Sequence, residues 1–204
     1  ISFLTANNYG VANGPNYLIS ADFNNDGRDD IATSFLNYGT KFIELLLADS
    51  NGNFGGSSSI NVGCANLKFN KGDYNGDGKV DIATLCNDGD WPDDTLSIVL
   101  GNGLGGFSSS IQNIFPSLYS IWGFGQNHTS GDFNEDGSDE MAVLGSGDSI
   151  GVLFNSGNNT VFLPNQFAFP GAITSADYNG DGHIDIAFVG TTFFPPFKTK
   201  LRVF

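Results

Sequence analysis

The hydrophobic residues of this chain gather in short, partly β-branched runs separated by polar and glycine-rich stretches, and no run has helical periodicity. Each run is too short for a typical helix, so we expect strands. The runs recur in a fixed order around a polar nine-residue motif: one before it, two after it, and a shorter fourth after a Gly/Asn turn. The strands expected before the motifs are 17–21, 65–69, 118–124 and 172–176, and the longer ones after them are 41–47, 95–100, 149–154 and 198–204.

The nine-residue motif reads Asp-x-Asn-x-Asp-Gly-x-x-(Asp/Glu) and occurs four times. We call the copies Asp loops 1 to 4, and they occupy 22–30, 73–81, 132–140 and 177–185. Their starts are 51, 59 and 45 residues apart, and the distance around the two ends of the chain is 49 residues. This near-even circular spacing predicts four whole repeats.

Four short antiparallel strands per repeat, joined by glycine-rich turns, predict an all-β fold. The specific expectation is a β-propeller of four-stranded antiparallel blades, with four repeats in this chain. The repeats would form one domain, 1–204, in which an N-terminal strand at 1–4 completes the last blade beside 198–204 and leaves no open edge. The expected repeats are 17–63, 64–115, 116–169, and 170–204 together with 1–16.

The residue types in the Asp loops predict calcium binding, with about four ions, one per repeat. Calcium takes six to eight oxygen ligands, and alternate side chains of a short loop can supply most of them. Positions 1, 3, 5 and 9 offer carboxylate or amide oxygens, position 7 offers its backbone carbonyl, and glycine at position 6 permits a positive φ. The candidate ligands are Asp22, Asn24, Asp26, Arg28 and Asp30; Asp73, Asn75, Asp77, Lys79 and Asp81; Asp132, Asn134, Asp136, Ser138 and Glu140; and Asp177, Asn179, Asp181, His183 and Asp185.

The loops differ from EF-hands, which need a Glu at position 12 and flanking helices. Position 12 is Thr33, Thr84, Val143 and Phe188, and each lies in an apolar run. A single loop of this kind could be a plain polar turn. Four in the same strand context are not chance. Loop 3 departs from the others, because Glu140 replaces Asp at position 9.

Composition shows where the acidity of the chain comes from. The 204 residues carry a net charge of −14, and the loops hold four, three, five and three acidic residues, which is 15 of the 22. Four bound Ca²⁺ would bring the net charge to about −6. Only eight Lys and Arg are present, which argues against a nucleic-acid partner. No apolar run reaches the roughly 20 residues of a membrane span.

Several features favour a secreted protein. The chain begins at Ile1 without a signal peptide, so we expect a mature or excised form. Asn127 and Asn158 begin glycosylation sequons. Cys64 and Cys86 flank Asp loop 2, and in an antiparallel hairpin they would lie near each other. A disulfide there would contribute roughly 3 kcal/mol, while two buried thiols are the alternative.

The Asp loops, the Ile-Ala runs that follow them and the Gly-Asn-Gly turn at 101–107 make the chain similar to the FG-GAP/VCBS repeat family over essentially its whole length. The resemblance implies structural calcium in a loop that joins the first two strands of each blade, as in integrin α-subunits, fungal propeller lectins and some polysaccharide lyases. The family usually has seven or eight blades. Four repeats therefore leave three arrangements open: a small ring, a larger ring of two chains, or terminal strands exchanged along a filament.

The face opposite the Asp loops is the expected ligand site. An aromatic ring beside carboxylates is a common way to hold a sugar, and the candidates are Trp91, Asp90, Asp93, Tyr38 and Phe194. Trp91 could instead pack over its own loop. We expect a secreted lectin or adhesion protein that binds a glycan or an extracellular glycoprotein. The alternatives are a structural subunit, which would be a homo-oligomer, and a polysaccharide-degrading enzyme, although no catalytic constellation is evident and neither His128 nor His183 suggests one.

Overall fold

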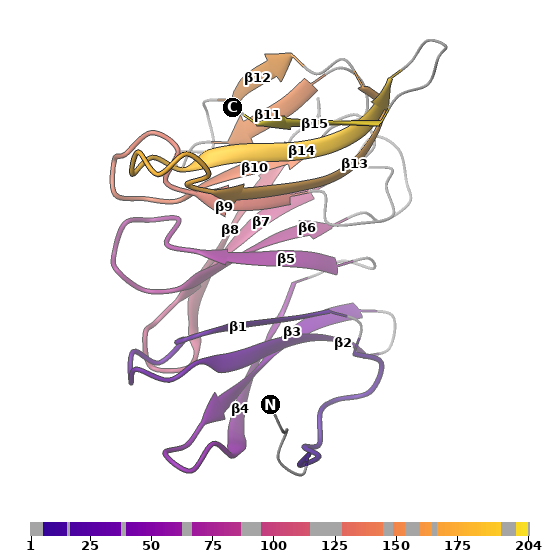
Figure 1. Ribbon diagram of the computed structural model, residues 1–204. Coiled ribbons are helices and arrows are strands. Elements are labelled where there is room, and N and C mark those ends of the chain that lie inside the picture. Colours follow the sequence, from indigo (N-terminus) through magenta and orange to yellow (C-terminus); the bar gives the residue numbers. More distant parts are fainter. Residues whose placement is uncertain are drawn as a thin grey trace.

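The computed structural model describes residues 6–15, 17–37, 40–62, 67–86, 95–114, 128–144, 149–153, 160–164, 167–192 and 199–203. In these residues the fold is all-β, with antiparallel sheets and no helix (Figure 1). Neighbours in each sheet follow one another along the chain. The first sheet comprises β1 (Leu18–Ala21), β2 (Asp30–Asn37), β3 (Thr40–Ala48) and β4 (Phe54–Asn61), and the second comprises β5 (Leu67–Gly72), β6 (Asp81–Cys86), β7 (Thr95–Gly101) and β8 (Phe107–Ile114). The third comprises β9 (His128–Gly131), β10 (Glu140–Leu144), β11 (Ser149–Leu153) and β12 (Thr160–Pro164), and the fourth comprises β13 (Phe167–Ala176), β14 (Asp185–Thr192) and β15 (Thr199–Val203).

Each Asp loop joins the first two strands of its sheet. The residue before the loop is paired with position 9, as in Ala21 with Asp30 and Gly131 with Glu140. The same pairing closes the hairpins of the second and fourth sheets. The loop is therefore the tip of a regular antiparallel hairpin, and the residues on either side of it have fixed neighbours.

The first strand of the third sheet lies closer to its loop than the sequence indicates. It is His128–Gly131, whereas the apolar stretch 118–124 was expected there and lies outside the described residues. His128 is buried at the position that Phe69 occupies in β5, four residues before the loop. A polar tetrapeptide forms this strand because its place between two sheets is set by the loop that follows it. Local hydrophobicity alone does not mark it.

The sheets stack face to face, with their first strands side by side: β1 beside β5, β5 beside β9, and β9 beside β13. The core lies between the sheets and not within one of them. One cluster joins the first and second sheets and includes Ala32, Leu45 and Phe69. A second joins the second and third sheets, and a third, around Phe188, joins the third and fourth. This arrangement is propeller-like.

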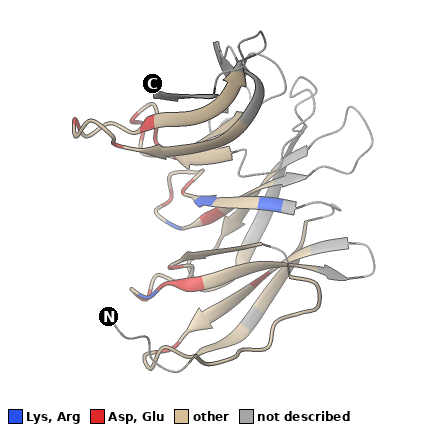
Figure 2. Cartoon of the chain, turned by 45° about the vertical axis from the view of Figure 1, so that its right-hand side comes forward, with Lys and Arg blue, Asp and Glu red and all other residues tan. Residues whose placement is uncertain are grey.

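The described part of the stack is open. Figure 1 shows the first sheet at one end and the fourth at the other, with Figure 2 agreeing from a second direction. The fourth sheet has three strands among the described residues. Residues 6–15 contact the first sheet, where the Tyr9 ring meets Phe54 edge-to-face at 5.3 Å and the Ala12 N–H donates to Glu44 Oε2 at 3.2 Å. The expected closing strand at 1–4 is not among the described residues.

Three further expectations concern features that the described residues only border. Cys86 ends β6, where its backbone pairs with Leu67 and Thr95. The position of Cys64 and the Cys86 side chain lie outside the description, so the disulfide stays a prediction, as do the sequons at Asn127 and Asn158. The described part of the chain has no helix of the length and apolar character that crossing a membrane requires.

Candidate functional site

The four Asp loops share one hydrogen-bonding pattern. The N–H of position 5 donates to the carboxylate of position 1 and to the amide oxygen of position 3, while the N–H of position 6 donates to the second carboxylate oxygen of position 1. The N–H of position 7 donates to the carboxylate of position 5. All of these distances lie between 2.7 and 3.2 Å. Asp and Asn side chains therefore fold each loop onto its own backbone.

Backbone angles confirm the glycine at position 6, which has φ between 77° and 92° in the four loops. Position 4 also has a positive φ, a feature that the sequence argument missed. Its residues are Asn25, Gly76, Glu135 and Gly180, with φ of 58°, 70°, 60° and 79°. Two glycines at this position were the available signal. A Glu in this region is uncommon, and the hydrogen bonds on either side hold it there.

Position 9 clamps each hairpin. One of its carboxylate oxygens accepts the N–H of position 2 at 3.0 to 3.1 Å in all four loops. The other oxygen of Asp30 accepts the Ala48 N–H at the end of β3, and that of Asp81 accepts the Gly101 N–H at the end of β7, both at 2.8 Å. In these two sheets a single carboxylate connects three strands. It has a structural role whether or not it also binds a cation.

The position 9 carboxylates of loops 1 to 3 are buried, and burial shifts their pKa values upward. Burial raises the pKa of Glu140 to about 7 and that of Asp81 to about 6, and nearby carboxylates of the same loops add to both shifts. Asp30 is raised for the same two reasons. Each loop thus concentrates negative charge around a carboxylate that water does not solvate, a situation that a bound cation relieves.

Side chains at position 7 supply positive charge at three loops. Arg28 pairs with Asp26, and Lys79 pairs with Asp77 at 2.7 Å, which lowers the pKa of Asp77. His183 of loop 4 reaches across to Glu135 of loop 3, which raises the pKa of His183. The sequence argument gave these side chains no role. They partly neutralise exposed carboxylates and, for His183, connect neighbouring sheets.

The donor types fit a hard divalent cation, because positions 1, 3, 5 and 9 hold only carboxylate and amide oxygens. Acidic residues gather in these loops (Figure 2). In the described residues, however, no three His, Cys, Asp or Glu side chains converge into a metal cluster. The oxygens instead accept backbone N–H groups. The loops therefore have the ligand chemistry of calcium sites in a conformation that is already closed by hydrogen bonds.

Neighbouring loops also contact one another. The Asp139 N–H donates to the Asp73 carbonyl, and the Asp73 N–H donates back to the Asp139 carboxylate, each at 2.8 Å. Burial raises the pKa of Asp139, and the charge of Asp73 contributes. Loops 2 and 3 thus form one continuous polar surface across two sheets.

The candidate ligand residues Tyr38, Asp90, Trp91, Asp93 and Phe194 lie outside the described residues. The strands on either side of them are described. These five residues belong to the β2–β3, β6–β7 and β14–β15 connections. Because each Asp loop joins the first two strands, those connections leave the sheets at the edge opposite the loops. The topology thus brings the three segments to the same edge of their sheets.

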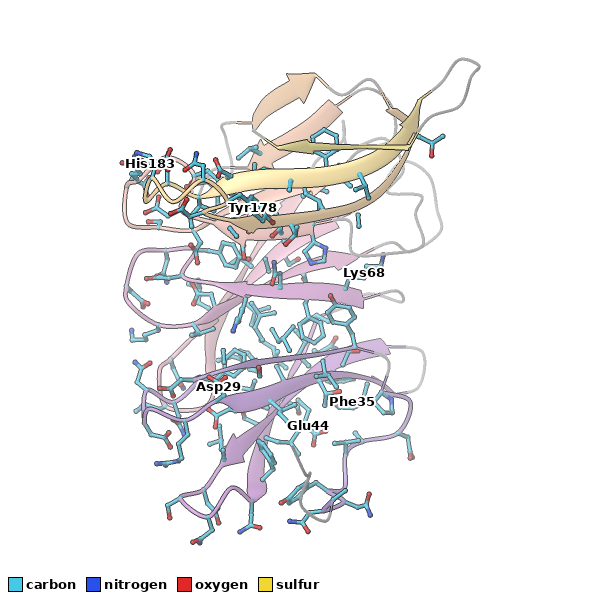
Figure 3. All side chains as sticks on the ribbon, in the orientation of Figure 1. Asp29, Phe35, Glu44, Lys68, Tyr178 and His183 are labelled. Atoms are coloured by element: carbon cyan, nitrogen blue, oxygen red, sulfur yellow. The ribbon has the colours of Figure 1, made fainter. Side chains whose placement is uncertain are left out.

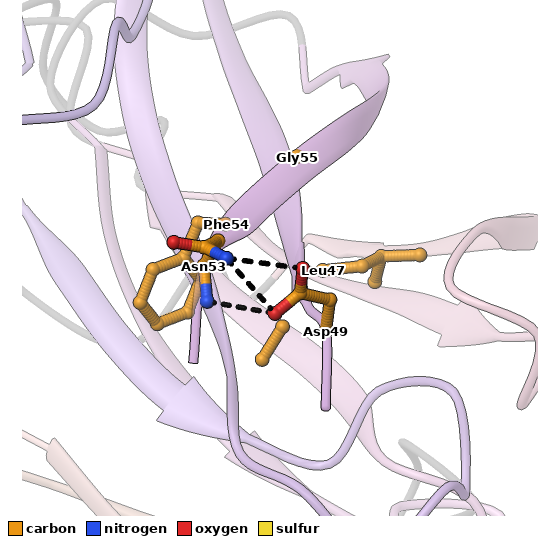
Figure 4. Close-up of a pocket in the computed structure, with 6 residues that line it drawn as sticks. Leu47, Asp49, Asn53, Phe54 and Gly55 are labelled. Atoms are coloured by element: carbon orange, nitrogen blue, oxygen red, sulfur yellow. Dashed lines mark hydrogen bonds between the residues drawn. The ribbon is translucent and has the colours of Figure 1, made fainter. Parts of the chain in front are cut away.

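An open pocket of about 300 Å³ lies at the β3–β4 turn, lined by Leu47, Ala48, Asp49, Asn53, Phe54 and Gly55 (Figure 4). Its carboxylate, Asp49, accepts the N–H groups of Asn51 and Asn53 at 2.8 and 2.9 Å, and these bonds lower its pKa. The polar groups of the pocket are therefore used by the turn itself, and the pocket has no pair of groups suited to acid–base chemistry.

Comparison with known proteins identifies the repeat. Three stretches, 22–84, 73–143 and 132–188, match the model of the FG-GAP-like repeat. Each begins at the first Asp of one loop and ends in the strand after the next loop, so the matched unit is the loop and its sheet. No curated protein matches the chain. Since the matches together cover 22–188, the chain belongs to the FG-GAP-like repeat family.

Proposed function

We propose that this chain is an extracellular binding module, stabilised by calcium, that recognises a glycan or a glycoprotein. The observation that carries the proposal is the series of FG-GAP-like repeats over 22–188, each built as a sheet with an Asp loop at its tip. FG-GAP repeats are generally those of binding or adhesion modules and are typically non-enzymatic. The finer assignments, to a lectin and to calcium, rest on the chemistry of the residues.

Calcium would stabilise the module through its Asp loops. Loops 1 to 3 bury a carboxylate whose pKa is raised by burial and by neighbouring charge. A divalent cation beside these carboxylates removes that penalty in the folded state only. Binding that is restricted to the folded state contributes roughly 2.7 kcal/mol per site at a hundred times its dissociation constant. Extracellular calcium is abundant enough for weak loops of this kind to be occupied.

The ligand would bind at the edge opposite the loops. The β6–β7 connection carries Trp91 between Asp90 and Asp93, and the β2–β3 and β14–β15 connections bring Tyr38 and Phe194 to the same edge. An aromatic ring stacks on the C–H face of a sugar while carboxylates accept its hydroxyl groups. Calcium holds the hairpins at one edge, so the connections at the other are presented by rigid strands.

A glycan array probed with the labelled protein in calcium tests the binding proposal. We expect a small set of related glycans to bind, Trp91→Ala to abolish that binding, and Leu104→Ala to leave it unchanged. Leu104 is an exposed apolar residue in the β7–β8 turn, away from the proposed face, so it is the matched control. Absence of binding to every glycan contradicts the lectin assignment. Loss of viscosity from a uronic-acid polymer would instead support the enzyme alternative.

A further inference from the structure

One face of the first sheet lacks the neighbour that the same face of every other sheet has. The residue four positions before each Asp loop points toward the preceding sheet. Phe69, His128 and Ile173 are buried at this position, whereas Leu18 is 67% exposed. Phe69 packs on the first sheet and Ile173 on the third. Leu18 has no preceding sheet to pack on in the described structure.

The fourth sheet is open on the opposite face. Position 2 of each Asp loop is aromatic and points toward the following sheet. Phe23 and Tyr74 are buried there, and Phe133 packs on the cluster shared with the fourth sheet. Tyr178 is 47% exposed. Figure 3 shows Tyr178 in the fourth sheet, well separated along the stack from Asp29 of the first. The two open faces therefore belong to opposite ends.

A repeated hydrogen bond fixes how one sheet sits on the next. The residue two positions before each loop donates its side chain to the backbone carbonyl of the equivalent residue in the preceding sheet. Lys71 Nζ donates to the Ser20 carbonyl at 2.6 Å, Ser130 Oγ to the Lys71 carbonyl at 2.7 Å, and Ser175 Oγ to the Ser130 carbonyl at 2.7 Å. The series begins at the Ser20 hydroxyl and ends at the Ser175 carbonyl. These are a donor and an acceptor on the two open faces.

The outer edges of the two open faces are also complementary. At the contact of the first two sheets, Ser58 of β4 donates to the Gly105 carbonyl at 2.8 Å. Gly52 is the equivalent residue in the first sheet, and its carbonyl accepts from the Tyr9 hydroxyl at 3.4 Å. The segment 6–15 thus stands where the fourth strand of a preceding sheet would lie. The fourth sheet has three strands among its described residues, so it would leave room for that segment.

We propose that the open face of the first sheet docks on the open face of the fourth sheet of a second copy of this chain. The contact would continue the internal sheet-to-sheet register. The Ser20 hydroxyl would donate to the Ser175 carbonyl of the second copy, which would cover Leu18, while Tyr178 of that copy would be covered in return. The chain cannot make this contact with itself, because the faces lie at opposite ends of the stack (Figure 1). Head-to-tail contacts of this kind are heterologous.

Sedimentation velocity over a range of concentrations tests for the contact. We expect a two-chain or larger species whose association Leu18→Glu weakens by roughly tenfold or more, because a carboxylate would be buried against an apolar face. Leu104→Glu is the matched control, since Leu104 is 80% exposed and lies on neither open face. Circular dichroism checks that both variants stay folded. A parent chain that is monomeric at every concentration, or equal effects of the two variants, overturns the proposal.

Cysteine cross-linking tests the register. Thr129 Oγ1 and Ser175 Oγ are 2.7 Å apart across the third and fourth sheets, and the equivalent pair across two copies is Thr174 and Ser20. Both of these residues are exposed. Mixing the Thr174→Cys and Ser20→Cys variants should give a disulfide-linked pair of chains joined at these positions, identified by peptide mass spectrometry. Either variant alone should not. No linkage in the mixture, or equal linkage in the single variants, contradicts the register.

Discussion

At the scale of single residues, burial of ionisable groups governs the chemistry of this protein. Glu140 and Asp81 are carboxylates that strands enclose, and His128 is an imidazole between two sheets. Each group is less stable in its charged form than it would be in water. For a carboxylate the penalty appears as the pH rises, and for a histidine it appears as the pH falls. The two kinds of group therefore oppose one another in the acidic range.

Glu140→Gln should stabilise the metal-free protein above about pH 7. The folded-state pKa of Glu140 is about 7, above the unfolded value of 4.5, so the folded state holds the proton more tightly and loses stability as the pH rises between them. Glutamine keeps an oxygen to accept the Phe133 N–H. Urea unfolding in EDTA across this range measures the effect. Glu135→Gln, an exposed change in the same loop, should show no such pH dependence. A lower stability of Glu140→Gln at every pH contradicts the prediction.

His128→Phe should reduce the loss of stability in acid. Burial lowers the pKa of His128 to about 4, with Lys68 contributing, and in the described structure neither ring nitrogen has a hydrogen-bond partner. Between pH 6.5 and about 4 the unfolded chain binds a proton that the folded chain excludes, so stability falls by up to about 1.4 kcal/mol per pH unit. Phenylalanine occupies the equivalent position 69. Urea unfolding at several pH values checks this, with the exposed His183→Gln as control.

At the scale of elements, the turn between the third and fourth strands connects one sheet to the sheet before it. The Gly105 N–H in the β7–β8 turn donates to the Phe23 carbonyl at 3.2 Å, and Gly105 packs on Leu47 of the first sheet. Gly52 is its equivalent in the β3–β4 turn. The two glycines have nearly the same φ, 75° and 77°, but different surroundings.

Gly105→Ala should destabilise the protein more than Gly52→Ala does. Both changes place a Cβ on a residue with positive φ, which costs about 1–2 kcal/mol. At Gly105 the added atom would also lie 2.5 Å from Leu47 Cδ1, whereas at Gly52 it meets nothing within 4 Å. The extra clash should add about 1–3 kcal/mol. Chemical denaturation of the two variants measures the difference, and equal losses would show that the turn does not hold the two sheets together.

At the scale of the whole molecule, the net charge of −14 is distributed mostly over the four loops at one edge of the sheets. Four loops of like charge on adjacent sheets repel one another. Hydrogen bonds between loops, such as the reciprocal pair of Asp73 and Asp139, offset part of that repulsion. Cations would offset more, which makes stability a property of the calcium concentration as well as of the sequence.

Calcium should raise the melting temperature of the protein, and EDTA should reverse the rise. The expected gain is roughly 2–3 kcal/mol for each occupied loop at a hundredfold excess over its dissociation constant. Differential scanning calorimetry measures the shift, and isothermal titration counts the sites. Sodium chloride of equal ionic strength is the control, because simple screening of the net charge would act without calcium. An identical response to both salts would contradict specific binding.

Particular residues show how far the sequence could be read. The Asp loops predicted the hairpins because their Asp and Asn side chains bond to backbone N–H groups within nine residues, a local interaction. His128–Gly131 was missed as a strand because its burial depends on β5 and β13, which lie far away in the sequence. The second role of position 9 was missed for the same reason, since its partners Ala48 and Gly101 come about 20 residues later.

The sequence by itself determined the repeat, the all-β class and the oxygen-rich chemistry of the loops, because each of these is set by residues close together in the chain. Only the tertiary structure decided how the sheets are related. The open stack and the exposure of Leu18 and Tyr178 depend on which sheet lies beside which. So does the series of hydrogen bonds from Lys71 to Ser175. Such contacts join residues 45 to 59 positions apart, and no local pattern encodes them.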